Sequence, residues 1–192
     1  PLWKLAERAK KNKVKVILSG EGADEIFGGY TRYMPVFMQW KLNKRFPSYD
    51  YLFGKFYNSY LQGYTNLTIR EKNNAEYTKK IMKPYFEMFD DPVTSMCFFD
   101  FKVIMPSLLQ MGDRMSSAFG VENRCPFLDK DIIEFGFNLD IDQKINFIKQ
   151  KIILRNILKK RLSSKYSEIE KKGLTIKFNN WFNADSWDRT KY

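Results

Sequence analysis

A short strand, a glycine turn and a helix start near the N-terminus constrain this chain more than any other feature. The β-branched run over residues 14–18 predicts a buried strand. The turn over residues 19–22 follows it, and Asp24 and Glu25 favour a helix N-terminus immediately afterwards. Anions collect at such a junction, because backbone N–H groups face outward and the helix dipole adds partial positive charge.

Two carboxylates, Glu21 and Asp24, occupy this turn and would repel a bare phosphate. A site that keeps both acids needs Mg²⁺ between acid and phosphate, or uses one acid as a proton acceptor. The turn therefore indicates nucleotide chemistry, although it is neither a Walker P-loop nor a GxGxxG fingerprint. The alternative is that this segment is a plain strand-to-helix turn capped by acids, with no ligand, and the turn alone does not decide between the two.

The remainder of the chain is predominantly helical in its pattern. Proline, glycine and polar stretches punctuate the helices, and Pro92 and Pro106 are among these positions. One strand does not make a sheet, so we expect its partners upstream of this chain. The predicted fold class is mostly α with a short parallel β remnant. The predicted helices cover residues 2–11, 49–60, 75–89, 94–110, 130–138 and 149–162.

The positive charge of the chain first suggests a nucleic-acid partner. The 192 residues contain 33 Lys and Arg against 22 Asp and Glu, which gives a formal net charge of +11. The lysines are scattered over helix-like segments, where a solvated face is normal, so nucleic-acid binding is not favoured. A non-catalytic basic helical binding module is kept as an alternative.

The residue inventory limits the metal and the compartment. The chain has no histidine, which excludes a Ser-His-Asp or Cys-His mechanism and a histidine-bound metal within it. The expected metal is a hard, oxygen-bound ion such as Mg²⁺. Cys97 and Cys125 form no CxxC pair and fit a reducing, cytoplasmic setting. No apolar run approaches the roughly 20 residues of a membrane span, so we expect no membrane partner.

A second group of charged residues lies in or beside apolar stretches. Charges in such a context are paired or face a wet cleft. A structural ion pair between Arg124 and Asp113 is one interpretation, and a cleft-facing Glu122 is the functional one. Asp129 is expected to cap the following helix. The full set is Asp113, Arg114, Glu122, Arg124 and Asp129.

A third group consists of Lys151 and Arg155, four residues apart on a predicted helix and so on one face. By themselves they favour a solvated basic face. Two cations one turn apart could also clamp a polyphosphate.

Together these segments strongly resemble the synthetase (ATP-pyrophosphatase) domain of the glutamine-hydrolysing asparagine synthetase family and its β-lactam synthetase relatives. The family pattern LSGxGxDExFGGY is read over residues 18–30, and DRMSMAxxxExRxPFLD over residues 113–129, with Ser117 in place of Met. KxxLR is read over residues 151–155. A KKGFxxPxxxW-like tail is read over residues 171–181, with Leu174 for Phe and Lys177 for Pro.

The resemblance implies a fold and an activity. The fold is an incomplete adenine-nucleotide α-hydrolase-like (PP-loop ATPase) α/β domain. The family binds ATP and Mg²⁺, transfers AMP to aspartate and releases pyrophosphate; ammonia from a glutaminase domain of the same protein then attacks the acyl-adenylate to give asparagine. Relatives amidate other carboxylates, such as a sugar acid of a surface polysaccharide, so another small carboxylate stays open as the substrate. Homodimerisation stays open as well.

The resemblance also assigns roles to residues. Asp24 corresponds to the carboxylate that holds Mg²⁺ and pyrophosphate. The implied catalytic residues are Glu21, which takes a proton from the attacking amine, Glu122 in the substrate cleft, and Lys151, which neutralises charge on the phosphates. The implied nucleotide-binding residues are Leu18, Ser19, Gly20, Glu21, Asp24, Lys151 and Arg155.

Two parts of the family pattern do not occur in these 192 residues: the phosphate loop SGGxDS and the N-terminal cysteine of the glutaminase domain. We therefore expect residues 1–192 to be the C-terminal portion of the synthetase domain, without the glutaminase domain and the first PP-loop motif. The isolated chain is expected to be inactive.

Overall fold

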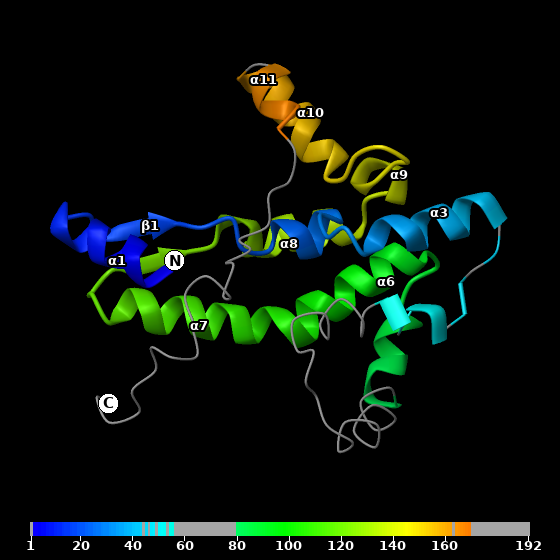
Figure 1. The fold of residues 1–192 in the computed structure, drawn as a ribbon, viewed down its shortest axis with the longest axis horizontal. Coiled ribbons are helices and arrows are strands. Elements are labelled where there is room, and N and C mark those ends of the chain that lie inside the picture. The colour runs from blue at the N-terminus through cyan, green and yellow to red at the C-terminus, as the bar shows by residue number, and fades with distance from the viewer. Residues whose placement is uncertain are drawn as a thin grey trace, which may run out of the picture.

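The computed structural model describes residues 2–43, 45, 47–48, 50–52, 54–55, 80–162 and 164–169, which form a mostly helical structure with one short sheet. The elements are α1 (Leu2–Lys11), β1 (Val16–Leu18), α2 (Ala23–Phe27), α3 (Tyr33–Asn43), α6 (Pro92–Phe99), the π-helix η1 (Asp100–Ile104), α7 (Met105–Ser117), β2 (Glu122–Arg124), the 3₁₀ turn η2 (Pro126–Leu128), α8 (Lys130–Phe137), α9 (Ile141–Lys144), α10 (Ile152–Arg161) and α11 (Ser164–Ser167). A long helix lies along one side, and α10 and α11 project away from the body (Figure 1).

The sheet consists of β1 and β2, which pair in parallel with Val16 opposite Glu122 and Leu18 opposite Arg124. This confirms the short parallel sheet, but the expectation that the strand's partners lie upstream was wrong for this neighbour. The prediction of a buried strand was also wrong, since Leu18 is 72% exposed. The physical reason is that the faces of a two-stranded ribbon are left uncovered unless further layers pack on them.

A continuous helix of 26 residues is built from α6, η1 and α7. It begins at Pro92. The preceding residue, Asp91, is its N-cap, and the Asp91 side chain accepts a hydrogen bond from the Thr94 N–H at 2.7 Å. The helix predicted over residues 94–110 contains Pro106, and the structure extends it through this proline to Ser117. The π-turn places a Met105 N–H to Asp100 C=O bond just before the proline. This wider turn relaxes the backbone where a proline lacks a donor, so the helix continues.

By length and composition alone, this 26-residue helix is apolar enough to cross a membrane. Half of its most apolar window is buried inside the chain, as in the core helix of a globular domain. It also carries the fully buried acid Asp100 near its middle. Packing within the chain therefore accounts for about half of this apolar window.

The described part of the chain confirms most of the predicted helices. Residues 2–11 form α1 as predicted, and Asp129 caps α8 by accepting from the Asp131 N–H at 3.0 Å. The helix predicted over residues 149–162 begins only at Ile152, because Lys151 has a left-handed backbone. Residues 80–86 are helical within the 75–89 prediction. Residues 87–89 form a turn and a bend, so the predicted helix ends earlier than expected. Residues 75–79, most of residues 49–60 and the 171–181 motif lie outside the described residues.

The hydrophobic core supports the region where β1 leads into α2. Helix α2 contacts α6, α8 and α10, and its Ile26 and Phe27 are buried. This packing holds α2 firmly although the helix has only five residues. The core cluster consists of Tyr33, Val36, Phe37, Leu52, Met82, Phe86, Val93, Met96, Cys97, Phe99, Ile141 and Ile145.

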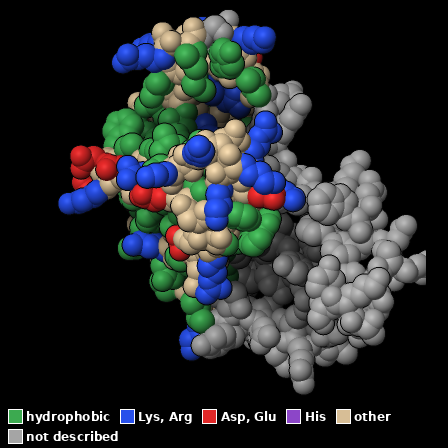
Figure 2. All heavy atoms as spheres, turned by 90° about the vertical axis from the view of Figure 1, so that its left-hand side faces the viewer, with side chains coloured by type: hydrophobic (Ala, Val, Ile, Leu, Met, Phe, Trp, Pro, Cys, Tyr) green, Lys and Arg blue, Asp and Glu red, His purple; other side chains and the backbone are tan. Residues whose placement is uncertain are grey.

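The distribution of charged side chains on the surface decides how the formal net charge of +11 is interpreted. On the face shown in Figure 2, lysine and arginine side chains are interspersed with acidic and apolar ones and form no continuous basic stripe. Several are paired locally, as Lys4 and Lys11 are with Glu7 at 3.0 and 3.1 Å. This face fits a solvated basic surface better than a nucleic-acid groove.

Candidate functional site

Two glycines frame the short helix α2. Gly22 precedes it with φ +92° and Gly28 follows it with φ +70°, conformations that L side chains rarely adopt. A Cβ on Gly22 would lie 2.5 Å from Leu128 Cδ2, so the turn packs directly against η2. The first and second sequence motifs therefore meet here.

The carboxyl ends of the two strands lie together. The Ser19 N–H donates to the Arg124 carbonyl at 2.9 Å, and Ser19 Oγ lies 3.2 Å from Cys125 Sγ. Ligands of parallel sheets bind at this edge of the strands, because the loops that follow them converge there. Ser19 and Gly20 thus begin the wall of a site.

The third motif reaches the same place through an ion pair. Lys151 Nζ lies 3.0 Å from Asp24 Oδ1, and both side chains keep about a quarter of their surface exposed. A Cβ on Gly29 would lie 1.9 Å from Asp24 Oδ1 and 2.6 Å from Lys151 Cε. The pair therefore occupies the space that a side chain at residue 29 would need.

A cleft of about 410 Å³ opens beside this ion pair. The pair supplies one acid and one cation to its wall, and Arg155 adds a second cation. The remaining lining is mostly apolar, which suits a small ligand with one charged end. The lining residues are Gly20, Ala23, Asp24, Phe127, Lys151, Leu154, Arg155, Leu158, Tyr166 and Ile169.

Glu21 lies in the same turn and is partly buried. Burial raises its pKa above the ordinary value for a glutamate, and the neighbouring charges of Glu25 and Asp24 raise it further. A carboxylate with a raised pKa is a stronger base, which is the property that a proton acceptor needs.

A buried polar layer follows the site residues in the chain, built on the buried acids Glu25 and Asp100. Glu25 accepts a hydrogen bond from the Tyr30 hydroxyl. Asp100 accepts hydrogen bonds from Arg32, at 2.6 Å, and from the Tyr33 hydroxyl. Burial raises the pKa of Asp100 to about 6 despite the nearby guanidinium of Arg32. This network links the segment after α2 to the long helix.

Sequence reasoning missed the buried layer, although one signal for it exists. Asp100 is an acid in the middle of the apolar pattern over residues 92–110. A charge inside an apolar helix requires a partner, so Asp100 predicts that some cation packs against this helix. Only the fold identifies that cation as Arg32.

Glu122 is not brought to the Asp24–Lys151 pair. It lies at the amino end of β2, is exposed, and forms an ion pair with Arg124 at 2.8 Å. The side chain of Arg124 lowers the pKa of Glu122. The interpretation that Arg124 pairs with Asp113 was wrong. Glu122 and Arg124 are two residues apart on one strand, so their side chains lie on the same face and pair with each other. The carboxylate of Asp113 instead accepts a hydrogen bond from Ser117 on its own helix.

The two remaining predicted residues, Leu18 and Arg155, differ in their surroundings. Leu18 ends β1 with an exposed side chain. Arg155 lines the cleft, yet its guanidinium donates to main-chain carbonyls of Gln150, Ser167 and Ile169 at 2.7 to 3.0 Å.

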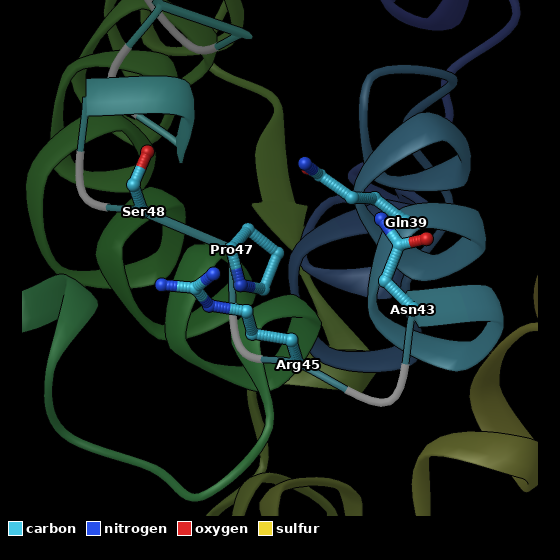
Figure 3. A pocket seen from close by; sticks show the side chains of 5 residues that line it. All are labelled: Gln39, Asn43, Arg45, Pro47 and Ser48. Carbon is cyan, nitrogen blue, oxygen red and sulfur yellow. The ribbon is translucent and has the colours of Figure 1, made fainter.

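A second pocket, of about 350 Å³, lies where α3 ends and shares no lining residue with the cleft. Gln39 and Asn43 extend from α3 and line it together with Arg45, Pro47 and Ser48 (Figure 3). None of these five residues belongs to the motifs that meet at the Asp24–Lys151 pair, so this pocket is separate from the candidate site.

Comparison with known proteins agrees with this assembly of motifs. The signature of the family described as asparagine synthase matches residues 1–190. The chain belongs to the asparagine synthase family. Three glutamine-hydrolysing asparagine synthetases illustrate the family: number 3 of Bacillus subtilis is 32% identical over 82% of this chain, number 1 of Bacillus subtilis is 29% identical over 94%, and number 1 of Arabidopsis thaliana is 28% identical over 76%.

The resemblance inferred from the motifs is thereby confirmed at the level of the family. The matches cover 25%, 33% and 16% of the lengths of those three relatives. The chain thus spans a third or less of an asparagine synthetase of this family, and the activity of the whole protein is treated below as a proposal.

The backbone at Lys151 leads to a stability prediction. Its φ of +53° lies in the left-handed region, which costs a non-glycine residue about 1 kcal/mol or more. We expect the Lys151→Gly form of the full-length protein to be about 1 kcal/mol more stable than the Lys151→Ala form, because both lack the ammonium and only alanine keeps the strain. Chemical denaturation measures the difference. The same pair of changes at Lys149 should favour alanine or show no difference, and equal stability at residue 151 would contradict the prediction.

Proposed function

We propose that this chain is part of the synthetase domain of an ATP-dependent amidotransferase ligase. In the full-length protein the ligase would convert aspartate and glutamine-derived ammonia into asparagine through an acyl-adenylate. The observation that carries the proposal is the Asp24–Lys151 ion pair in the wall of a cleft, where three separate sequence motifs meet. Family membership supports the ligase class.

The coordination of Mg²⁺ would be shared between the protein and ATP. Within the described residues, no group of three or more His, Cys, Asp or Glu side chains could hold a metal unaided. Asp24 can offer one carboxylate oxygen, and Mg²⁺ commonly completes its coordination with phosphate oxygens and water. The bound ion would offset the negative charge of the phosphates. Gly20 leaves open space for close approach of a ligand to the backbone.

The other nucleotide contacts follow from position. Lys151 would move its ammonium from Asp24 to the departing pyrophosphate, where a preorganised cation lowers the barrier most. Arg155 would add positive potential from the cleft wall. Ser19 and Gly20 would contact the nucleotide through side-chain and main-chain groups at the carboxyl end of β1, next to Leu18. The Ser19 N–H already donates to the Arg124 carbonyl.

Two bond exchanges make up the proposed reaction. A carboxylate oxygen of aspartate attacks the α-phosphorus of ATP, and the bond to pyrophosphate breaks. The nitrogen of ammonia then attacks the activated carbonyl carbon, and the bond to AMP breaks. Glu21 accepts the proton that the attacking nitrogen loses, helped by its raised pKa. Glu122 is kept as a proposed acid of the substrate cleft.

The remaining features of the proposal concern the whole protein. The parallel β1–β2 pair would be part of a larger PP-loop α/β sheet, completed by the first phosphate loop. A glutaminase domain of the same protein would deliver the ammonia, in the cytoplasm. Residues 1–192 alone would then show no ATP–pyrophosphate exchange. A different carboxylate, such as a sugar acid, remains the alternative substrate.

The proposal is tested by nucleotide binding to the full-length protein. Asp24→Ala should weaken MgATP binding at least about tenfold, since the change removes a metal-facing carboxylate. Titration calorimetry measures the dissociation constant, and Asp142→Ala, at an exposed acid on α9, serves as the matched control. Unchanged MgATP binding by Asp24→Ala would refute the proposal. Nucleic-acid binding that falls steeply with salt would instead favour a basic binding module.

A further inference from the structure

The backbone at Lys151 is the feature from which the inference starts. Lys151 stands immediately before α10 in a left-handed conformation, with φ +53° and ψ +46°. Within the described residues, Lys13 is the one other non-glycine residue with positive φ. Such a conformation persists when the surroundings enforce it, so something must hold this residue in place.

Arg155 holds the main chain on both sides of Lys151. The Arg155 N–H donates to the Lys151 carbonyl at 3.0 Å, as the first turn of α10 requires. Arg155 Nε donates to the carbonyl of Gln150 at 2.8 Å. One carbonyl precedes the Lys151 Cα and the other follows it, so the two bonds together restrict both φ and ψ of that residue.

Gln150 connects this arrangement to the other side of the cleft. Its side-chain amide Nε2 donates to the Tyr30 carbonyl at 3.0 Å. Tyr30 follows Gly29, whose N–H donates to the Asp24 carbonyl at 2.8 Å. A short chain of hydrogen bonds therefore runs from the residue before Lys151 to the backbone of Asp24.

The guanidinium of Arg155 is also anchored on the far side. Its Nη1 donates to the carbonyls of Ser167, at 2.7 Å, and of Ile169, at 3.0 Å. A guanidinium bound to three carbonyls is fixed in orientation. It serves the geometry of the main chain more directly than it could serve a mobile phosphate.

We propose that Gln150 and Arg155 are positioning residues that hold Lys151 in its left-handed conformation, so that its ammonium reaches the Asp24 side of the cleft. This inference rests on the proposed function, because it assumes that Lys151 binds the phosphates. It gives Arg155 a role that depends on the shape of its side chain as well as on its charge.

The first experiment replaces Gln150 by methionine, which is similar in shape but has no donor, in the full-length protein. We expect the dissociation constant for MgATP, measured by calorimetry, to rise about tenfold, as loss of precise placement of a charged group would produce. Gln143→Met, the same change at an exposed position on α9, should leave it unchanged. Binding by Gln150→Met equal to that of the wild type would overturn the inference.

A double-mutant cycle separates positioning from general structural damage. If Gln150 acts through Lys151, Gln150→Met should cause no further loss of MgATP binding once Lys151→Ala is present. An equal further loss in that background would overturn the inference. If Lys151→Ala alone leaves MgATP binding unchanged, the premise that Lys151 binds the phosphates fails and the inference is overturned, whereas the proposed function is decided separately by Asp24→Ala.

Arg155→Lys supplies a second, independent variant. It keeps the positive charge but loses the guanidinium geometry that reaches the carbonyls of Gln150, Ser167 and Ile169. We expect a loss of MgATP binding similar to that of Gln150→Met. Full binding by Arg155→Lys would show that charge alone matters and would overturn the positioning role of Arg155.

Discussion

Replacing Lys151 by alanine in the full-length protein is expected to lower the rate of asparagine formation on the order of 100-fold or more. The ammonium of Lys151 lies 3.0 Å from Asp24 Oδ1 at the wall of the cleft. Negative charge develops on pyrophosphate as it leaves, and a fixed cation at that point stabilises the transition state more than the ground state. The loss should therefore extend to aspartate-dependent ATP–pyrophosphate exchange, which reports adenylation alone.

Lys149→Ala is the matched control for this prediction. Lys149 lies two residues away, is partly exposed, and pairs with Glu168 rather than with the cleft acid. Both rates should stay near those of the unmodified protein. Near-normal turnover by Lys151→Ala, with aspartate, ATP and Mg²⁺ all saturating, would remove Lys151 from the catalytic residues.

Glu21→Gln is expected to separate the two chemical steps. Asparagine formation should fall on the order of 100-fold, which is within the usual contribution of a general base. Aspartate-dependent ATP–pyrophosphate exchange should continue, because the amide of glutamine still fits the turn and adenylation does not use this proton acceptor. Parallel measurement of both rates on the full-length protein tests the prediction.

The pH dependence offers a second test of Glu21. Burial, Glu25 and Asp24 all raise the pKa of this carboxyl, so it takes up its proton at a higher pH than an ordinary glutamate. The wild-type rate of asparagine formation should decline as the pH is lowered through that raised pKa. The residual rate of Glu21→Gln should lack the decline, whereas Glu87→Gln, at an exposed acid, should keep it. If Glu21→Gln lowered asparagine formation and ATP–pyrophosphate exchange equally, the assignment of Glu21 to the attack of ammonia would be contradicted.

Local signals in the sequence predicted much of the secondary structure. Asp129 acts as the expected helix N-cap, and glycines stand on either side of α2, as side-chain chemistry and backbone freedom require. Errors arose where neighbours in space decide the outcome. The polar strand β2 has no alternating pattern of its own and exists because β1 offers it hydrogen bonds.

The candidate site was predictable as a set of residue types but not as an arrangement. Glu21, Asp24 and Lys151 were identified from motifs, and the structure places the last two in contact. Glu122 was identified in the same way, yet it lies at the opposite end of its strand, paired with Arg124. The supporting contacts of Gln150 could not be predicted, since a hydrogen bond to a distant main-chain carbonyl leaves no trace in the pattern of either segment.

The sequence by itself determined the family and the local caps, because motif composition and backbone preference act over a few neighbouring residues. The tertiary structure alone decided which charges meet. Asp24 and Lys151 are far apart in the chain, and they are joined because α2 packs between the core and α10 while Arg155 and Gln150 hold the backbone of Lys151 in a strained shape. Long-range packing controls such contacts, and no local preference encodes them.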